Sequence, residues 1–250
     1  MTNADGDHFD AFTDQSDYQK AFVEFVSRLP ENGVVIAHGR DEGSMDIIRD
    51  AKRTFIDADS ESLPTLGVPG VHMQENAQLV LSIAKHLGIP EAEALTTLRE
   101  YEGSWRRMEV KGTKSGITVV DDYAHHPAEI KATLSAMKAA YPERKIIAVF
   151  QPHTHDRTLK LWDEFSLCFT DADEVLLTSV YDARPDRESE KVDEAAFAAA
   201  IGERSGKPTF HCGSLQKTEQ ILCSSRLISG DVAVVMGAGD ITKLCDRLLQ

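Results

Sequence analysis

The chain has 250 residues, of which 42% are hydrophobic, and its 41 acidic and 27 basic residues give a formal net charge of −14. These values are typical of a soluble globular protein of one or two domains. The charge argues against a non-specific binder of nucleic acids or anionic membranes, because such proteins depend on clustered Lys and Arg. It does permit a local basic pocket for phosphate.

The sequence indicates neither a targeting or membrane-spanning segment nor a zinc or redox site built from cysteines. No stretch resembles a signal peptide, and no apolar run approaches the length of a membrane span. The four cysteines are scattered without the C-x-x-C spacing of zinc or redox sites. We therefore expect a cytoplasmic protein with buried free thiols.

The part before Gly103 is expected to be an incomplete α/β unit, because it contains helices but few strands. Amphipathic spacing, short apolar runs and Gly or Pro breaks define its elements. In chain order these are a helix at Tyr18–Leu29, a strand at Val34–Ala37, a helix at Met45–Ala51, a loop at Asp57–Pro69, and helices at Gln74–Leu87 and Glu91–Tyr101.

From Ile117 onward, apolar strands alternate regularly with helices. The predicted strands are Ile117–Val120, Ile146–Phe150, Glu174–Ser179, Thr209–His211 and Val232–Met236. The predicted helices are Ala128–Ala140, Leu159–Phe169, Val192–Ile201, Leu215–Leu227 and Ile241–Leu249. Such alternation predicts an α/β fold, with a Rossmann-like C-terminal domain at residues 104–250 whose sheet is mostly parallel and has helices on both faces. The incomplete unit occupies residues 1–103.

Three of the predicted strands run directly into clusters of polar residues or glycines. The clusters are Asp121-Asp122-Tyr123-Ala124-His125-His126-Pro127, then Gln151-Pro152-His153-Thr154-His155-Asp156-Arg157-Thr158, and Gly237-Ala238-Gly239-Asp240. The carboxyl ends of parallel strands share one edge of a sheet, where ligands bind in open α/β folds. We therefore predict a ligand crevice at this edge.

Each cluster also has a purely structural interpretation. The first could be a loop whose Asp and Pro cap the next helix. We adopt that interpretation for Pro127 but not for the whole cluster, since two adjacent imidazoles add nothing to a cap. The Gly-Ala-Gly turn could serve only close packing, and it lacks the third glycine of a dinucleotide fingerprint.

Three arginines are candidates for binding an anion. Arg157 follows a strand, and its planar fork of donors suits a carboxylate or phosphate; the alternative is a surface salt bridge with Asp163 or Glu164. Arg106 and Arg107 could form an anion clamp, or they could be a solvated basic pair between domains.

Candidate residues also occur in the N-terminal part. His8 lies among acidic residues that, with its imidazole, suit magnesium or manganese, although a solvated acidic terminus explains the same pattern. His72 and Asn76 lie one helical turn apart, so both can face one ligand. As isolated residues they would instead be a helix cap and a surface amide.

Together these stretches resemble the Mur ligase family, the ATP-dependent amide-bond ligases of peptidoglycan synthesis, and within it the alanine-adding branch. The resemblance covers the whole C-terminal domain and continues upstream. It is carried by the stretches Val119–Ile130, Val149–Thr154 with Arg157-Thr158, Met236–Ile241, Gly103–Arg107, Pro69–His72 with Asn76, and Thr2-Asn3 with Asp7-His8-Phe9-Asp10.

The family has a UDP-sugar domain, a central ATPase domain and a C-terminal domain that brings the amino acid. The resemblance implies that residues 1–103 are part of the central domain and that residues 104–250 are the C-terminal domain. The phosphate-binding pattern G-x-x-x-x-G-K-[ST] occurs nowhere in the 250 residues. The chain is thus expected to be a fragment, or a natural half that needs a complementing chain, and not a competent ligase alone.

The resemblance also implies a reaction and its participants. A complete ligase of this branch joins L-alanine to UDP-N-acetylmuramate through an acyl phosphate, with ATP and Mg²⁺ or Mn²⁺. The resemblance implies His8 as a metal ligand. For the nucleotide it implies His72 and Asn76, with Asn76 as the adenine contact, Arg106 or Arg107 for phosphate, and Asp122 for the ribose hydroxyls. Tyr123, His125 and Arg157 are implied to position the amino acid, with Arg157 on its carboxylate.

Some positions depart from the family pattern. Met73 stands where Asn is usual, Asp5 stands where Glu is common, and the loop Asp57–Gly67 is shorter than the strand-bearing segment expected there. These departures affect the nucleotide site more than the amino-acid site. Two alternatives remain open: a murein tripeptide-recycling ligase, and a non-catalytic nucleotide-binding or interaction module with the same fold.

Overall fold

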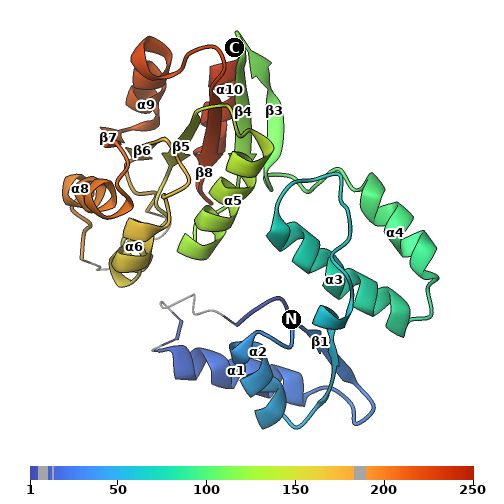
Figure 1. Cartoon of the computed structure of the whole chain (residues 1–250). Coiled ribbons are helices and arrows are strands. Elements are labelled where there is room, and N and C mark those ends of the chain that lie inside the picture. Colours follow the sequence, from blue (N-terminus) through green and yellow to red (C-terminus); the bar gives the residue numbers. More distant parts are fainter. Residues whose placement is uncertain (5–10, 13, 183–189) are drawn as a thin grey trace. The chain divides into compact units, whose positions relative to one another are not determined.

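The structure is a computed structural model that describes residues 1–4, 11–12, 14–182 and 190–250. It divides into two compact units, Met1–Glu102 and Gly103–Gln250 (Figure 1). His8 and Asp5 lie outside the described residues. Within the described ranges, no helix combines the length and the apolar character needed to cross a membrane.

The first unit contains a small parallel sheet and two helical pairs. Strands β1 (Val34–Ala37) and β2 (Thr54–Asp57) pair in register and pack, with α1 (Gln15–Ser27) and α2 (Glu42–Asp50), around a buried apolar cluster. A single 3₁₀ turn at Ala58–Ser60 leads toward α3 (Val71–His86) and α4 (Glu91–Glu100), which share a second small core. Aspartate side chains at Asp14 and Asp41 cap α1 and α2.

The second unit is built on one six-stranded sheet. Its strands are β3 (Glu109–Lys114), β4 (Ile117–Asp122), β5 (Ile146–Phe150), β6 (Glu174–Thr178), β7 (Thr209–Gly213) and β8 (Val232–Met236), in the spatial order β3-β4-β8-β5-β6-β7. All neighbouring pairs are parallel except β3 with β4. This confirms the predicted α/β class with a mostly parallel sheet.

Helices cover both faces of this sheet. They are α5 (Pro127–Ala140), α6 (His155–Lys160), α7 (Trp162–Leu167), α8 (Glu194–Ser205), α9 (Leu215–Ile221), which continues into a π-helical turn at Leu222–Arg226, and α10 (Thr242–Leu249). On one face, Ile147 and Val149 of β5 join a core with residues of α9, its π-helical extension and α10. On the other, the Phe150 ring lies 5.6 Å from that of Phe165 in α7.

Burial explains why the central strands were predicted well. Every residue of β5 and β8 is buried, and both are continuous apolar runs, as expected for strands covered on two faces. Three predictions need correction. Strands β2 and β3 were not predicted, and the single helix expected at Leu159–Phe169 is instead α6 and α7, which meet at Leu161.

Candidate functional site

The three clusters singled out in the sequence lie on neighbouring strands. The register pairs Asp122 of β4 with Met236 of β8, and Met236 with Phe150 of β5, so the three strands end level with one another. The polar or glycine-rich segments that follow them therefore emerge side by side. This confirms that the clusters share the carboxyl edge of the sheet, where ligands bind in such folds.

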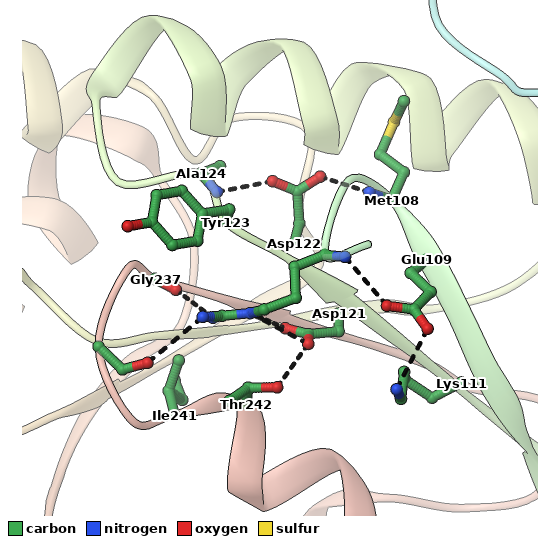
Figure 2. Close-up of polar contacts among 12 residues, drawn as sticks. Met108, Glu109, Lys111, Asp121, Asp122, Tyr123, Ala124, Gly237, Ile241 and Thr242 are labelled. Carbon is green, nitrogen blue, oxygen red and sulfur yellow. Dashed lines mark hydrogen bonds and ion pairs between the residues drawn. The ribbon is translucent and has the colours of Figure 1, made fainter. Parts of the chain in front are cut away.

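The two adjacent aspartates of the first cluster have different partners (Figure 2). Asp121 is fully buried; its carboxylate lies 3.2 Å from Nε of Arg106 and accepts a hydrogen bond of 2.6 Å from Thr242 Oγ1. Asp122 instead accepts two backbone hydrogen bonds, from Ala124 at 2.7 Å and from Met108 at 2.8 Å. Asp121 thus binds two side chains, whereas Asp122 binds two backbone N–H groups.

Burial of Asp122 has an electrostatic consequence. Only 3% of the residue is exposed, and loss of hydration raises the pKa of its carboxyl group from 3.8 to about 6, although the two backbone N–H groups act in the opposite direction. A carboxylate offers about four lone-pair positions, and two are used here. Asp122 can accept further hydrogen bonds, and each donor would favour its ionised form.

Arg106 and Arg107 have different environments. Arg106 is 4% exposed and donates to the Gly237 carbonyl at 2.5 Å and to the Gly239 carbonyl at 3.5 Å, in addition to Asp121. A solvated basic pair is therefore wrong for Arg106. The Arg107 side chain is 45% exposed and lies 3.4 Å from Glu129. Both guanidinium groups lie over the Tyr123 ring, at 5.1 and 5.5 Å from its centroid.

His126 forms the cap that the sequence interpretation rejected. Its Nδ1 accepts a hydrogen bond from the Ala128 backbone at 3.3 Å, and Glu129 completes a capping box by accepting from the His126 backbone at 3.2 Å. The statement that the second imidazole adds nothing to a cap was wrong. The expected role of Pro127 is confirmed, because it occupies the first helical position of α5.

Tyr123, His125 and Arg157, which were predicted to position an amino acid, converge through one further imidazole. The His125 ring lies 5.3 Å from Tyr123 and 5.9 Å from His153, measured between centroids. Nη1 of Arg157 lies 3.2 Å from Nδ1 of His153. The His153 ring stacks on Tyr181 with centroids 5.7 Å apart.

Sequence reasoning gave no role to His153 or Tyr181. His153 lies inside the second cluster, so its position at a strand end was a usable signal. Tyr181 follows β6 and forms a bridge with His153, in which the Tyr181 N–H donates to the Pro152 carbonyl at 2.8 Å. The end of this fourth parallel strand could have been included by the same argument that selected the other three.

The Gly-Ala-Gly turn after β8 serves close packing. A Cβ atom at Gly239 would lie 2.6 Å from Cγ of Tyr181 and 2.5 Å from Oε1 of Gln151. Gln151 is itself buried and accepts a hydrogen bond of 3.1 Å from the Ile241 backbone. The space beside Gly239 is thus filled by side chains, and its carbonyl faces Arg106.

The remaining candidates belong to the first unit. His72 and Asn76 lie in the first turns of α3, after Gly70, which adopts a φ of 105°. His72 is half-buried and Asn76 is exposed. Among the residues that the structure describes, no three His, Cys, Asp or Glu side chains are grouped to hold a metal ion. The proposed metal ligand His8 is outside those residues.

Comparison with known proteins identifies the family. Residues 106–239 match the family described as Mur ligase, glutamate ligase domain. The chain is 35% identical over 280 residues to the UDP-N-acetylmuramate--L-alanine ligase of Clostridium acetobutylicum and 35% identical over 289 residues to that of Koribacter versatilis. In both cases the match covers 100% of this chain and 60% of the relative, so the chain spans about 60% of their length.

Solved structures agree with this result. The UDP-N-acetylmuramate-alanine ligase MurC from Thermotoga maritima superposes with a TM-score of 0.73 at 25% identity, over 99% of this chain and 57% of that one. The murein peptide ligase mpl from Psychrobacter arcticus shares the fold, with a TM-score of 0.70 at 22% identity over 99% of this chain and 56% of the other. On the family match, which spans more than half of its residues, the chain belongs to the Mur ligase family.

Proposed function

We propose that this chain is part of an ATP-dependent ligase that joins L-alanine to UDP-N-acetylmuramate. In this proposal, residues 104–250 are the domain that binds the amino acid and part of ATP, and residues 1–103 belong to the central ATP-binding domain. The observation that carries the proposal is the convergence of Tyr123, His125 and Arg157 at the level ends of neighbouring parallel strands. The match to relatives that are named for this reaction covers the whole of this chain.

Arg157 is suited to bind the carboxylate of the amino acid. Its guanidinium group carries donors in a planar fork, which matches a carboxylate bidentately. Because one Nη1–H donates to Nδ1 of His153, the rotation of the group is restricted. A fixed contact on the carboxylate orients the amine of the same small molecule toward its target.

His125 is suited to accept a proton from that amine. Its Nδ1 lies 2.9 Å from the Tyr123 carbonyl, which can only accept, so the neutral ring carries its hydrogen on Nδ1 and its lone pair on Nε2. During reaction the amine nitrogen bonds to the acyl carbon, phosphate leaves with the electrons of the C–O bond, and the surplus proton passes to a base. A neutral imidazole can take that proton near neutral pH.

The nucleotide half of the proposal rests on Asp122, Arg107 and residues of the first unit. Asp122 retains lone pairs for the ribose hydroxyls, and Arg107 is more exposed than Arg106, which makes it the better phosphate contact. His72 and Asn76 are proposed for the adenine, and His8 for Mg²⁺ or Mn²⁺. ATP would supply the phosphoryl group that activates the muramate carboxylate.

A chimera tests the proposed reaction. The part of the Clostridium acetobutylicum ligase that lies outside the match would be joined to this chain, and phosphate release would be measured with UDP-N-acetylmuramate and ATP. L-alanine should support turnover, whereas glycine, L-serine and the tripeptide L-alanyl-γ-D-glutamyl-diaminopimelate should support much less. Preference for the tripeptide would replace the proposal by the recycling ligase. A folded chimera that binds nucleotide but acts on none of them would favour a non-catalytic module.

A further inference from the structure

The segment that leads into β3 has a conformation that needs outside support. Arg106 and Met108 both adopt the left-handed backbone region, with φ of 53° and 49°. Residues other than glycine adopt it at a cost and remain there only when their surroundings hold them. The Arg106 carbonyl accepts from the Tyr123 backbone at 2.8 Å, and the Met108 N–H donates to Asp122.

The Arg106 side chain joins parts of the second unit that are distant in the sequence. All three of its nitrogen atoms have acceptors inside the unit, namely Asp121 and the carbonyls of Gly237 and Gly239. Figure 2 shows Thr242 hydrogen-bonded to the Asp121 carboxylate, with the carbonyl of Gly237 nearby. A lysine could neutralise Asp121, but its single ammonium cannot reproduce a planar fork that reaches two carbonyls as well.

The contacts of Arg106 form a closed circuit around the carboxyl edge. From Arg106 the circuit passes to the Tyr123 ring, to His125, to His153 and to Tyr181. Tyr181 packs against Gly239 so closely that no Cβ atom fits there, and the Gly239 carbonyl accepts from Arg106.

We propose that Arg106 is a positioning residue that holds the turn after β8 in place and, through Gly239 and Tyr181, sets the placement of His153 and Arg157. Arg157 contacts this circuit at His153. Arg106 uses its donors within the protein, whereas the neighbouring Arg107 offers its donors to an anion. The placement itself is a property of the fold. Its importance for the amino acid rests on the function proposed above.

Nuclear magnetic resonance on the chain as it stands tests the placement. Arg106→Lys should shift the amide signals of Gly237 and Gly239 and also the ring signals of Tyr181 and His153, which Arg106 does not touch. Arg107→Lys is the matched control and should leave those four residues unchanged. Shifts confined to the direct partners Asp121, Tyr123, Gly237 and Gly239 would overturn the proposal.

A second variant covers the case in which Arg106→Lys does not fold. Replacing both partners, Arg106→Met with Asp121→Leu, removes the buried ion pair without leaving an unpaired charge. The same ring signals of Tyr181 and His153 should shift in this double variant, and unchanged signals would again overturn the proposal.

Kinetics of the chimera then test the consequence for the substrate. Arg106→Lys should raise the KM for L-alanine by roughly tenfold to a hundredfold, because displacement of a positioning group by about 1 Å has effects of this size. The KM for ATP should change much less, and Arg107→Lys should show the reverse. A wild-type chimera that is folded and binds nucleotide but is inactive would refute the proposed function, while the spectra still decide the role of Arg106. Equal changes in both KM values would reject selective positioning of the amino-acid contacts.

Discussion

The titration of Asp122 gives a quantitative test of the site. Burial raises the pKa of this carboxyl group from 3.8 to about 6 in the folded chain, so the folded state binds the proton more tightly than the unfolded state. The stabilisation that follows is fully present below about pH 4 and is lost as the pH rises through 6. At about 1.36 kcal/mol per pKa unit, the change corresponds to about 3 kcal/mol of unfolding free energy.

The matched variant is Asp122→Asn. An amide does not titrate in this range, and it can accept from only one of the two N–H groups, since its NH₂ faces the other. The variant therefore loses one hydrogen bond but also loses the pH dependence of Asp122. Subtracting its stability curve from that of the wild type removes the contributions of groups that do not interact with Asp122. Glu129 does interact with it, because its negative charge adds to the raised pKa of Asp122.

Denaturant unfolding between pH 4 and 7.5 provides the assay. The two tryptophans of the chain, Trp105 and Trp162, both lie in the second unit, so their fluorescence reports on the unit that contains Asp122. Part of the stabilisation of about 3 kcal/mol is already lost at pH 4, so the wild type should lose about 2 kcal/mol relative to the variant across this window. Parallel curves, or a carboxyl carbon signal of Asp122 that titrates below pH 4.5, would refute the reasoning.

Nucleotide binding extends the same test to function. Ribose hydroxyls that donate to Asp122 would stabilise its carboxylate, so ADP should lower the pKa of this group toward its ordinary value. If ADP binds the chain and the titration of Asp122 does not move, the proposed ribose contact is wrong.

Four other predictions concern stability and activity. Glu129→Ala removes half of the capping box and should lower the unfolding free energy by about 1 kcal/mol in thermal or denaturant unfolding; an unchanged value would mean that the box adds nothing. Phe150→Ala empties a fully buried position beside Phe165 and Phe169 and should cost about 3–5 kcal/mol, a prediction that a loss below about 1 kcal/mol would contradict. In the chimera, Arg157→Ala should raise the KM for the amino acid far more than that for ATP, and equal effects would remove Arg157 from its role. The isolated chain, which lacks the G-x-x-x-x-G-K-[ST] pattern, should release no phosphate in response to amino acids, so measurable turnover would overturn that expectation.

The central part of the fold could be predicted because its physical cause is local. Strands β5 and β8 are unbroken apolar runs between polar segments, and burial on both faces requires such runs. Their common edge followed from the alternation of strands and helices. The sequence alone therefore predicts that the residues that end β4 and those that follow β5 lie at one edge of the sheet, as the register of the strands confirms.

The features that the sequence did not predict depend mainly on partners that are distant in the sequence. Strand β3, Glu-Val-Lys-Gly-Thr-Lys, has no clear apolar alternation and pairs with β4 through a register shift at Gly112. Without β3, nothing in the sequence indicates that Arg106 lies beside Asp121. The cap at His126 was missed for another reason: imidazoles are not among the preferred capping residues, although a neutral ring nitrogen accepts a hydrogen bond as a carboxylate does.

The level register of β4, β8 and β5 also constrains how this protein can change over evolution. An insertion or deletion of one residue inside any of these strands would turn every following side chain to the other face and displace one cluster from the other two. Changes in the loops beyond the strand ends leave the buried layers intact. Diversification of this scaffold is thus expected to proceed by loop lengthening and replacement at one edge, while the lengths of the three strands stay fixed.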